Sequence, residues 1–464
     1  MFQIHIILYF VLFFSLETLE PLFEQLEQSD ISGKAFATVA IIGQELLAVD
    51  ELQSAITVLE SSLQLGTEDL ALKGSVYSAL SSAYWKTANV KRALHFMHQD
   101  LLTVESLNDN AGICRVHGNL GNAYFCQNQL SDAEHHHQQQ LETALQQDDT
   151  FQAANALTAL GHVYVALTNY EDALSHHKRS ALLRQQSGNT LLEAKELANV
   201  AAVYALIGDY ENAIKCQEEH LRIVKEIGDD EETCRALSLL GGLAQGMRKY
   251  EDADKSFQEM FKIAQENDDF ENQCKALSGL GNAYRLQGKI KTAESCHEQQ
   301  LKIAIEIQSQ EMEAKAQADL GLAYQEKGDF NKALEYQKAY LESCRKINDR
   351  EGEGRAYGNI GLAYQSLGQF ERAIKYHKLG LSAIKDLNDR HSEASLHGNI
   401  AASFQSLMMM DQALQHYQDH LKISLELKDL RSECTAESNL GMSISLINSF
   451  YNKYLHSPSS TRSL

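Results

Sequence analysis

The sequence predicts an all-α protein, a right-handed α-solenoid of stacked antiparallel helix pairs. Two observations lead to this prediction. Small and aromatic residues recur with a period of 40 along most of the 464 residues, and repeats of this length are typical of helical solenoids. Proline occurs only at Pro21 and Pro458, outside the periodic region. A proline inside a helix removes a hydrogen bond and clashes with the preceding turn, so its absence favours helix throughout.

A small residue at every fortieth position marks the first helix of each repeat, and we call this position the small phase. Its members are Gly121, Gly161, Gly241, Gly281, Gly321, Gly361 and Gly441, with Ser81, Ala201 and Ala401. Twelve residues later runs an unbroken series of Ala93, Ala133, Ala173, Ala213, Ala253, Ala293, Ala333, Ala373 and Ala413. An aromatic residue follows the small phase by three positions in most repeats. Small side chains let helices approach closely, and the aromatic ring completes the apolar stripe of the helix.

Turn residues separate the helices. In Leu206-Ile207-Gly208-Asp209-Tyr210, a glycine follows one helix and an aspartate can cap the next. A longer turn with Asn or Asp, such as Asn348-Asp349, is expected between repeats. Each repeat is then a hairpin of helix A and helix B, which buries its apolar face only by stacking on its neighbours.

These patterns divide the chain into four parts. We expect a divergent first repeat at 31–69, a regular array at 70–447 and a Ser-rich, disordered tail at 448–464. Residues 1–30 form an atypical apolar segment, whose run from Ile4 to Leu16 is short for a membrane span. A signal peptide, an anchor and an atypical start of a cytoplasmic array all remain open for it. No membrane association is expected unless this segment is a true signal or anchor.

Composition and motifs argue against several functions. The net charge of −22 favours solubility and opposes a broad nucleic-acid surface, which needs clustered Lys and Arg. Neither a phosphate-binding glycine loop nor a catalytic motif is present, so we predict no enzyme activity and no cofactor. The helix-B histidines recur at one phase and should therefore be spread along the array. We expect packing roles for them and no metal site, because ligands must converge on one point.

The motif Leu320-Gly321 to Tyr324, followed by Gly328-Asp329-Phe330 to Ala333, resembles the tetratricopeptide repeat. The regular 40-residue unit is similar to a long-helix subgroup that includes the Pins/LGN-type spindle-orientation adaptors. The resemblance spans residues 35–447. It implies a scaffold or adaptor that binds protein partners through extended segments. It further implies a cytoplasmic location, association with the cytoskeleton or centrosome, and a role in cell division or cytoskeletal organisation.

In such arrays helix A lines a concave groove, and residues three or four positions apart share one face of a helix. Six positions before the small phase runs a series that we call the cation row: Arg115, Asn155, Lys195, Arg235, Lys275, Lys315 and Arg355. On the same face we expect an asparagine ladder of Asn119, Asn122, Asn199, Asn282, Asn359 and Asn399. Asparagine both donates and accepts, so the ladder can bond a ligand main chain, while the cations select acidic or phosphorylated segments.

Other interpretations remain open. The cation row can instead form ion pairs with nearby acids, which contribute only about 0–1 kcal/mol when exposed, and the asparagines can bond between repeats. At the level of function, the alternatives to a peptide-binding scaffold are a self-associating structural array and a regulatory fragment of a longer multidomain protein.

Overall fold

The computed structural model describes residues 31–455. The predicted apolar segment at 1–30 lies outside these residues, as does the end of the predicted tail. The helices are α3 (Ile31–Ala48), α4 (Leu52–Leu65), α5 (Leu70–Lys86), α6 (Val90–Ser106), α7 (Asn110–Cys126), α8 (Leu130–Gln146), α9 (Thr150–Ala166), α10 (Tyr170–Gln186), α11 (Thr190–Ile207), α12 (Tyr210–Ile227), α13 (Asp230–Gly246), α14 (Tyr250–Glu266), α15 (Phe270–Leu286), α16 (Ile290–Glu306), α17 (Gln310–Lys327), α18 (Phe330–Ile347), α19 (Arg350–Ser366), α20 (Phe370–Ile384), α21 (Arg390–Ser406), α22 (Met410–Leu427) and α23 (Leu430–Leu455).

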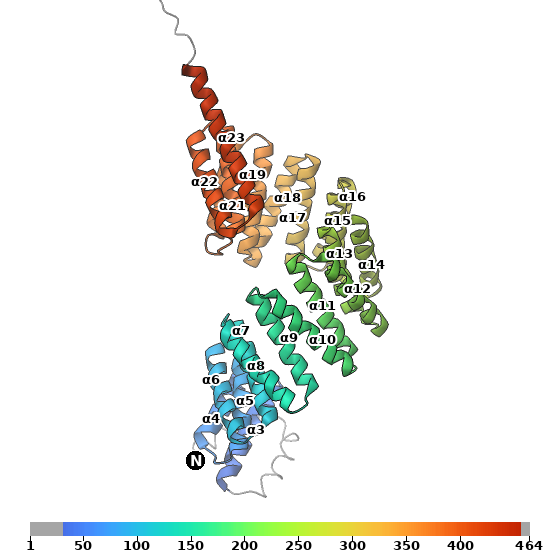
Figure 1. Ribbon diagram of the computed structural model, residues 1–464, viewed down its shortest axis with the longest axis vertical. Helices are drawn as coiled ribbons and strands as arrows, with labels where there is room; N and C mark the ends of the chain where they lie inside the picture. Colours follow the sequence, from blue (N-terminus) through green and yellow to red (C-terminus); the bar gives the residue numbers. More distant parts are fainter. Residues whose placement is uncertain (1–30, 456–464) are drawn as a thin grey trace, which may run out of the picture. The chain divides into compact units, whose positions relative to one another are not determined.

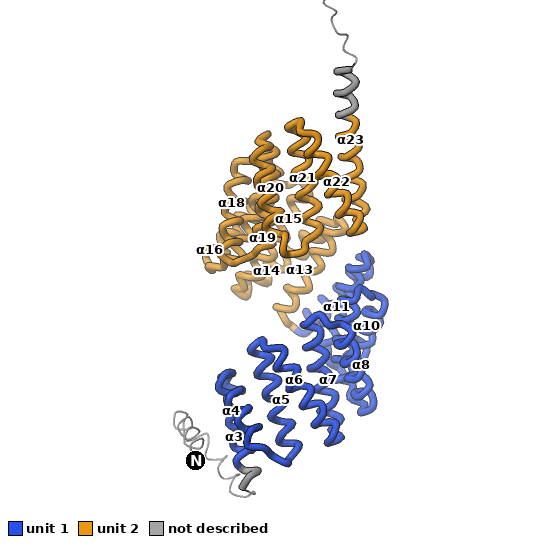
Figure 2. The backbone as a smooth tube through the Cα atoms, turned by 90° about the vertical axis from the view of Figure 1, so that its left-hand side faces the viewer, with its two compact units in different colours: residues 1–227 blue, residues 228–464 orange. Residues whose placement is uncertain are grey.

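The described chain is helical and contains no strand, as the sequence predicts. It divides into two compact units, residues 1–227 and 228–464 (Figure 2). Within each unit, successive helices pack side by side in chain order and form antiparallel pairs (Figure 1). The odd-numbered helices from α5 onward are the A helices, and the even-numbered helices from α6 are the B helices. No helix in residues 31–455 combines the length and the apolar character required to cross a membrane.

The 40-residue period follows from the turn geometry. Helices α5 to α10 each contain 17 residues, and three residues separate each helix from the next. Two helices and two turns therefore fill one period. The expectation of a longer turn between repeats is wrong from α5 to α20, where turns within and between repeats alike have two or three residues, each with a residue in the left-handed region. Gly208 has a φ of 87° between α11 and α12, and Asn348 has a φ of 57° between α18 and α19.

The aspartate cap predicted at Asp209 is confirmed, and Asp349 of the turn between repeats also caps a helix. The carboxylate of Asp209 accepts a hydrogen bond from the Asn212 amide at 3.2 Å, at the start of a B helix. Asp349 does the same for Gly352 at 2.8 Å, at the start of an A helix. Each carboxylate satisfies a backbone N–H that would otherwise lack a partner in the first helical turn.

The small phase exists because a large side chain of helix B lies directly over it. A β-carbon at Gly121 would come within 2.6 Å of the His137 ring, and one at Gly161 or Gly281 would likewise overlap His177 or His297. These histidines sit sixteen residues after the small phase, a position that we call the facing phase. Three of its histidines, His137, His177 and His297, are at most 1% exposed, which confirms their predicted packing role. All nine residues of the alanine series are fully buried beside them.

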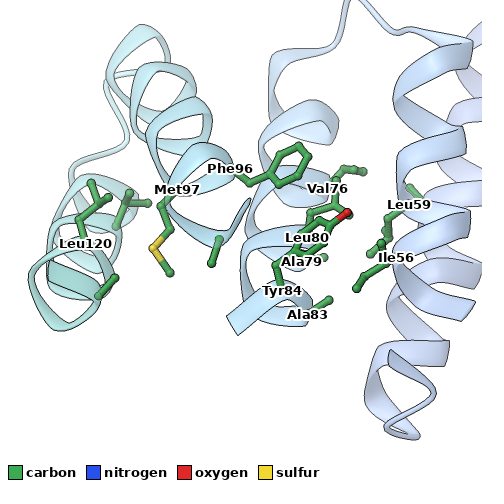
Figure 3. Packing of buried hydrophobic residues seen from close by; sticks show 14 of the residues in the cluster. Ile56, Leu59, Val76, Ala79, Leu80, Ala83, Tyr84, Phe96, Met97 and Leu120 are labelled. Carbon is green, nitrogen blue, oxygen red and sulfur yellow. The ribbon is translucent and has the colours of Figure 1, made fainter. Parts of the chain in front are cut away.

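The first repeats show how the core forms. Ile56 and Leu59 of α4 meet Val76 and Leu80 of α5, and the cluster continues through α6 to α7 (Figure 3). The aromatic residue that follows the small phase, Tyr84, stacks on a ring of the neighbouring helix with centroids 5.7 Å apart. The divergent first repeat thus folds as the hairpin α3–α4 and packs on the regular array.

The end of the array differs from the predicted boundary at residue 447. Helix α23 continues to Leu455, so the first residues assigned to the disordered tail are helical. The physical reason is that neither glycine nor proline occurs between Gly441 and Pro458 to stop the helix. The predicted tail from residue 456 onward lies outside the described part of the chain.

Candidate peptide-binding site

Unit 1 contains a hollow of about 520 Å³ between the A helices α7 and α9, with helices α8 and α10 forming its floor. We call it the α7–α9 hollow. It is lined by Arg115, Gly118, Asn119, Asn122, Phe125, His137, Gln140, Gln152, Asn155, Thr158, Ala159, His162 and Arg184. Four residues predicted from sequence, two of the cation row and two of the asparagine ladder, therefore meet in one concave site.

The spacing of three side chains along α7 explains how this helix lines one side of the hollow. Arg115, Asn119 and Asn122 are four and three residues apart, which aligns them on one face of the helix. Both asparagines are exposed. Gly118 lies against the floor, where an added β-carbon would come within 2.9 Å of the Gln140 side chain.

Arg115 has both a structural role and a place in the hollow. Its guanidinium donates to Ser78 Oγ at 2.8 Å and to Asp100 Oδ2 at 3.1 Å. The Asp100 side chain is only 2% exposed, and burial raises its pKa even though Arg115 opposes the shift. Because the Arg115 side chain remains 42% exposed, it still offers positive charge to a ligand. It also borders a second hollow of about 480 Å³ between α3, α5 and α7.

Arg184 is a residue of the site that the sequence analysis missed. It lies on α10 with 6% of its side chain exposed. Its Nη2 donates to Asn155 Oδ1 and to Thr158 Oγ1, both at 3.1 Å. Its Nη1 has no hydrogen-bond partner within the described residues. Arg184 thus fixes the orientation of Asn155, whose carbonyl oxygen is engaged and whose amide nitrogen is left to donate.

Glu196 of α11 is a buried acid that stabilises Arg184. One Glu196 carboxylate oxygen accepts from Thr158 Oγ1 at 2.6 Å, and the other lies 3.0 Å from His177 Nδ1. The Arg184 Nε lies 3.8 Å from the same carboxylate. Burial alone would raise the pKa of Glu196, but hydrogen bonds from His177 and Thr158, with the charge of Arg184, hold it below its usual value. Glu196 is therefore ionised inside the protein.

The sequence does contain a signal for this pair. The positions equivalent to Glu196 in the other repeats are Val76, Val116, Ala156, Ala236, Ala276, Ala316, Ala356, Leu396 and Ala436. The positions equivalent to Arg184 are Val104, Ala144, Val224, Ala264, Ala304, Cys344, Ile384 and Ser424. Arg184 on helix B of one repeat and Glu196 on helix A of the next thus place a base and an acid at two core positions that are small or apolar elsewhere.

Most of the remaining cation row lies on exposed helix surface and forms ion pairs. Arg235 pairs with Glu231 at 3.0 Å, Lys275 pairs with Glu271 at 2.6 Å, and Arg355 pairs with Glu351 at 3.0 Å. Each acid is four residues earlier on the same helix, the arrangement that the alternative interpretation anticipates. Lys195 and Lys315 are exposed and belong to no ion pair within residues 31–455. A ligand-binding role for these five residues stays a prediction.

The remaining asparagines of the ladder are partly buried and lie outside the α7–α9 hollow: Asn199, Asn282, Asn359 and Asn399. Some of them bond within the array. Asn359 Nδ2 donates to Gln337 Oε1 at 3.3 Å, and Asn282 Oδ1 accepts from Arg285 Nε at 3.4 Å. Their predicted role in holding a ligand main chain is likewise untested.

Comparison with known proteins identifies the fold family. The tetratricopeptide repeat family matches residues 112–186, 190–266, 272–346 and 312–386, which together exceed half of the chain. The chain belongs to the tetratricopeptide repeat family. These repeats form protein-interaction surfaces, and no catalytic family is among those matched.

Curated relatives share only part of the chain. Human tetratricopeptide repeat protein 28 is 43% identical over 104 residues, which is 22% of this chain and 4% of that protein. Mouse G-protein-signaling modulator 1 is 33% identical over 82 residues, 18% of this chain and 12% of that protein. The chain therefore covers a small fraction of the length of either relative.

Solved structures agree on the fold. A signal-transduction ATPase with a tetratricopeptide repeat sensor, from Pyrococcus horikoshii, aligns over 91% of this chain and 67% of its own. Its TM-score is 0.52 at 14% identity. The apo quorum sensor NprR from B. thuringiensis aligns over 74% of this chain and 98% of its own, with a TM-score of 0.50 at 14% identity. At such low identity the similarity concerns the fold alone.

Proposed function

We propose that this chain is a non-enzymatic scaffold that binds extended, acidic segments of partner proteins, with the α7–α9 hollow as the principal contact. The single observation that carries the proposal is the charge of the lining. Two arginines and no Asp or Glu line the hollow, in a protein whose net charge is −22. By contrast, Asp100 and Asp109 line the neighbouring hollow between α3, α5 and α7.

The hollow offers complementary groups for each part of a peptide. Exposed Asn119 and Asn122 can donate to and accept from an extended main chain, as amide side chains do. Arg115 supplies a charge-assisted bond to a carboxylate or phosphate. Phe125 adds an apolar surface to the same wall. This combination of polar groups that fix the main chain and a cation that selects side chains is typical of peptide grooves.

An array of short peptides of graded charge tests the proposal. Acidic and phosphoserine-containing peptides should retain the full-length chain, whereas neutral and basic peptides should not. The double variant Asn119→Ala/Asn122→Ala should bind the retained peptides roughly tenfold more weakly, because two hydrogen bonds of about 0.5–1.5 kcal/mol each are lost. Fluorescence anisotropy of the best peptide gives the two affinities.

The control removes a positive charge elsewhere in unit 1. Arg179 is exposed on α10 and is not part of the hollow lining, so Arg179→Ala should leave the affinity unchanged. Retention that does not depend on peptide charge, or equal weakening by both variants, would argue against the hollow as the binding site.

The cellular setting of the scaffold is a further part of the proposal. A cytoplasmic location, association with the cytoskeleton or centrosome, and a role in cell division are supported by the likeness of the repeat to the Pins/LGN-type subgroup. Since the chain covers only a small part of its curated relatives, service as a regulatory part of a longer protein is compatible with the same binding activity.

Self-association is the second candidate function, and the exposed side chains of α23 favour it. Leu430 is 74% exposed, and Met442 and Ile444 are 52% and 45% exposed. Light scattering of the chain with and without the residues after Gly441 distinguishes the two functions. A concentration-dependent dimer that the truncation abolishes supports a self-associating array.

A further inference from the structure

Two histidines and an aspartate of unit 2 converge between α21 and α22. His397 Nδ1 lies 2.9 Å from His416 Nδ1 and 3.5 Å from Asp419 Oδ2. One ligand atom from each of the three residues lies within 4.8 Å of the others. His397 comes from helix A, whereas His416 and Asp419 are three residues apart on helix B and share one of its faces.

The donor set matches that of a transition-metal ion. Zinc in proteins binds imidazole nitrogen and carboxylate oxygen at about 2.0–2.2 Å, and sites with three protein ligands keep a fourth position for water. In a tetrahedral arrangement such ligand atoms lie roughly 3.3 Å from one another, close to the two separations found here. We propose that His397, His416 and Asp419 bind one divalent transition-metal ion of the zinc type.

The surroundings hold the ligands in place and leave one side open. The His416 ring stacks on Phe404, with ring centroids 5.8 Å apart and an interplanar angle of 16°. The His397 side chain is 15% exposed and that of Asp419 is 45% exposed, so solvent can supply the remaining ligand.

The alternative is a hydrogen bond between two neutral histidines, and unit 1 contains such a pair for comparison. His117 and His136 occupy the same two positions in an earlier repeat, and their Nδ1 atoms are also 2.9 Å apart. Gln139 stands there in place of Asp419. The carboxylate therefore distinguishes the proposed metal site from a histidine pair alone.

Other repeats of the chain suggest substitutions that remove ligands without disturbing the packing. Tyr336 and Tyr376 occupy the position equivalent to His416, and each stacks on a tyrosine of its own hairpin. Leu237 and Leu277 occupy the position equivalent to His397. His416→Tyr and His397→Leu should therefore fold like the parent chain.

The test is a cobalt(II) titration of the tag-free, metal-stripped full chain, followed by visible absorption and by competition with zinc. We expect one equivalent of cobalt with the absorption of a four-coordinate site, and a higher midpoint of thermal unfolding. His397→Leu and His416→Tyr should abolish both effects, and Asp419→Asn should weaken binding at least about tenfold. His136→Tyr in unit 1 should change neither the stoichiometry nor the absorption.

Circular dichroism of each variant establishes that it is folded before the titration. The proposal is overturned if the folded His397→Leu and His416→Tyr proteins bind cobalt as the parent does, or if the parent shows no such absorption. It is also overturned if His136→Tyr causes the same loss as His416→Tyr, because a histidine pair without a carboxylate would then suffice.

Discussion

Glu196→Ala is expected to destabilise unit 1 by about 3–5 kcal/mol, the usual cost of removing one partner from a buried ion pair. The variant leaves Arg184 buried with 6% of its side chain exposed and takes the acceptor away from Thr158 and His177. Urea unfolding followed by circular dichroism measures the loss, and hydrogen exchange should show it in α9, α10 and α11.

The double variant Arg184→Ala/Glu196→Ala provides the matched control. It gives this junction between two repeats the small residues Ala264 and Ala276 found at the equivalent positions of a later junction. Replacing both members of a buried pair is often close to neutral, so most of the stability should return. If the single and double variants are equally unstable, the lost packing volume of Glu196, and not its charge, is responsible.

Lowering the pH should reproduce part of the destabilisation expected for Glu196→Ala. Because the folded state holds the pKa of Glu196 below its usual value, its contribution is fully present above about pH 4.3 and is lost as the pH falls through the folded pKa. The parent chain should therefore lose more stability on acidification than the double variant does.

Gly281→Leu is expected to cost about 3 kcal/mol, the upper range for overfilling a packed interior. An added β-carbon at this position overlaps the His297 ring, which is fully buried. The midpoint of urea unfolding should fall, and His297→Ala in the same chain should restore part of it by making space.

Gly441 is the matched control, because it occupies the small-phase position of α23. Among the described residues, no atom lies within 4 Å of a β-carbon built there. Gly441→Leu should therefore be neutral or should stabilise the helix by up to about 1 kcal/mol, the propensity difference between glycine and leucine. A similar loss at both glycines would mean that helix contact does not determine the small phase.

The repeat itself is predictable because every turn and every contact of the hairpin recurs. The alanine series, the caps at Asp209 and Asp349 and the aromatic positions all lie where the period places them. The length of the turn between repeats was predicted wrongly, since an Asn-Asp pair suggests a loop, whereas it supplies one left-handed residue and one cap. The last helix exceeded its predicted end because serine and asparagine weaken a helix without stopping it.

The site is only partly predictable from the sequence. Aligning the repeats by their 40-residue period reveals the residues that they share and hides those that occur once. Arg184 and Glu196 occur at one junction between repeats alone and form a network that depends on three helices. The histidines show a related limit. The equivalents of His416 on the other B helices are spread along the array, whereas its neighbour His397 lies across the same hairpin. Only the packing of helix A on helix B brings these rings together.

The most direct test of the scaffold hypothesis is to locate a bound peptide by photo-crosslinking. A photoreactive amino acid replaces Asn122 in the hollow in one protein and Arg179 of α10 in another, and each is irradiated with the best acidic peptide. We expect strong labelling from position 122, suppressed by unlabelled peptide, and only background labelling from position 179. Equal labelling from both positions, or labelling from position 179 alone, would contradict the hypothesis.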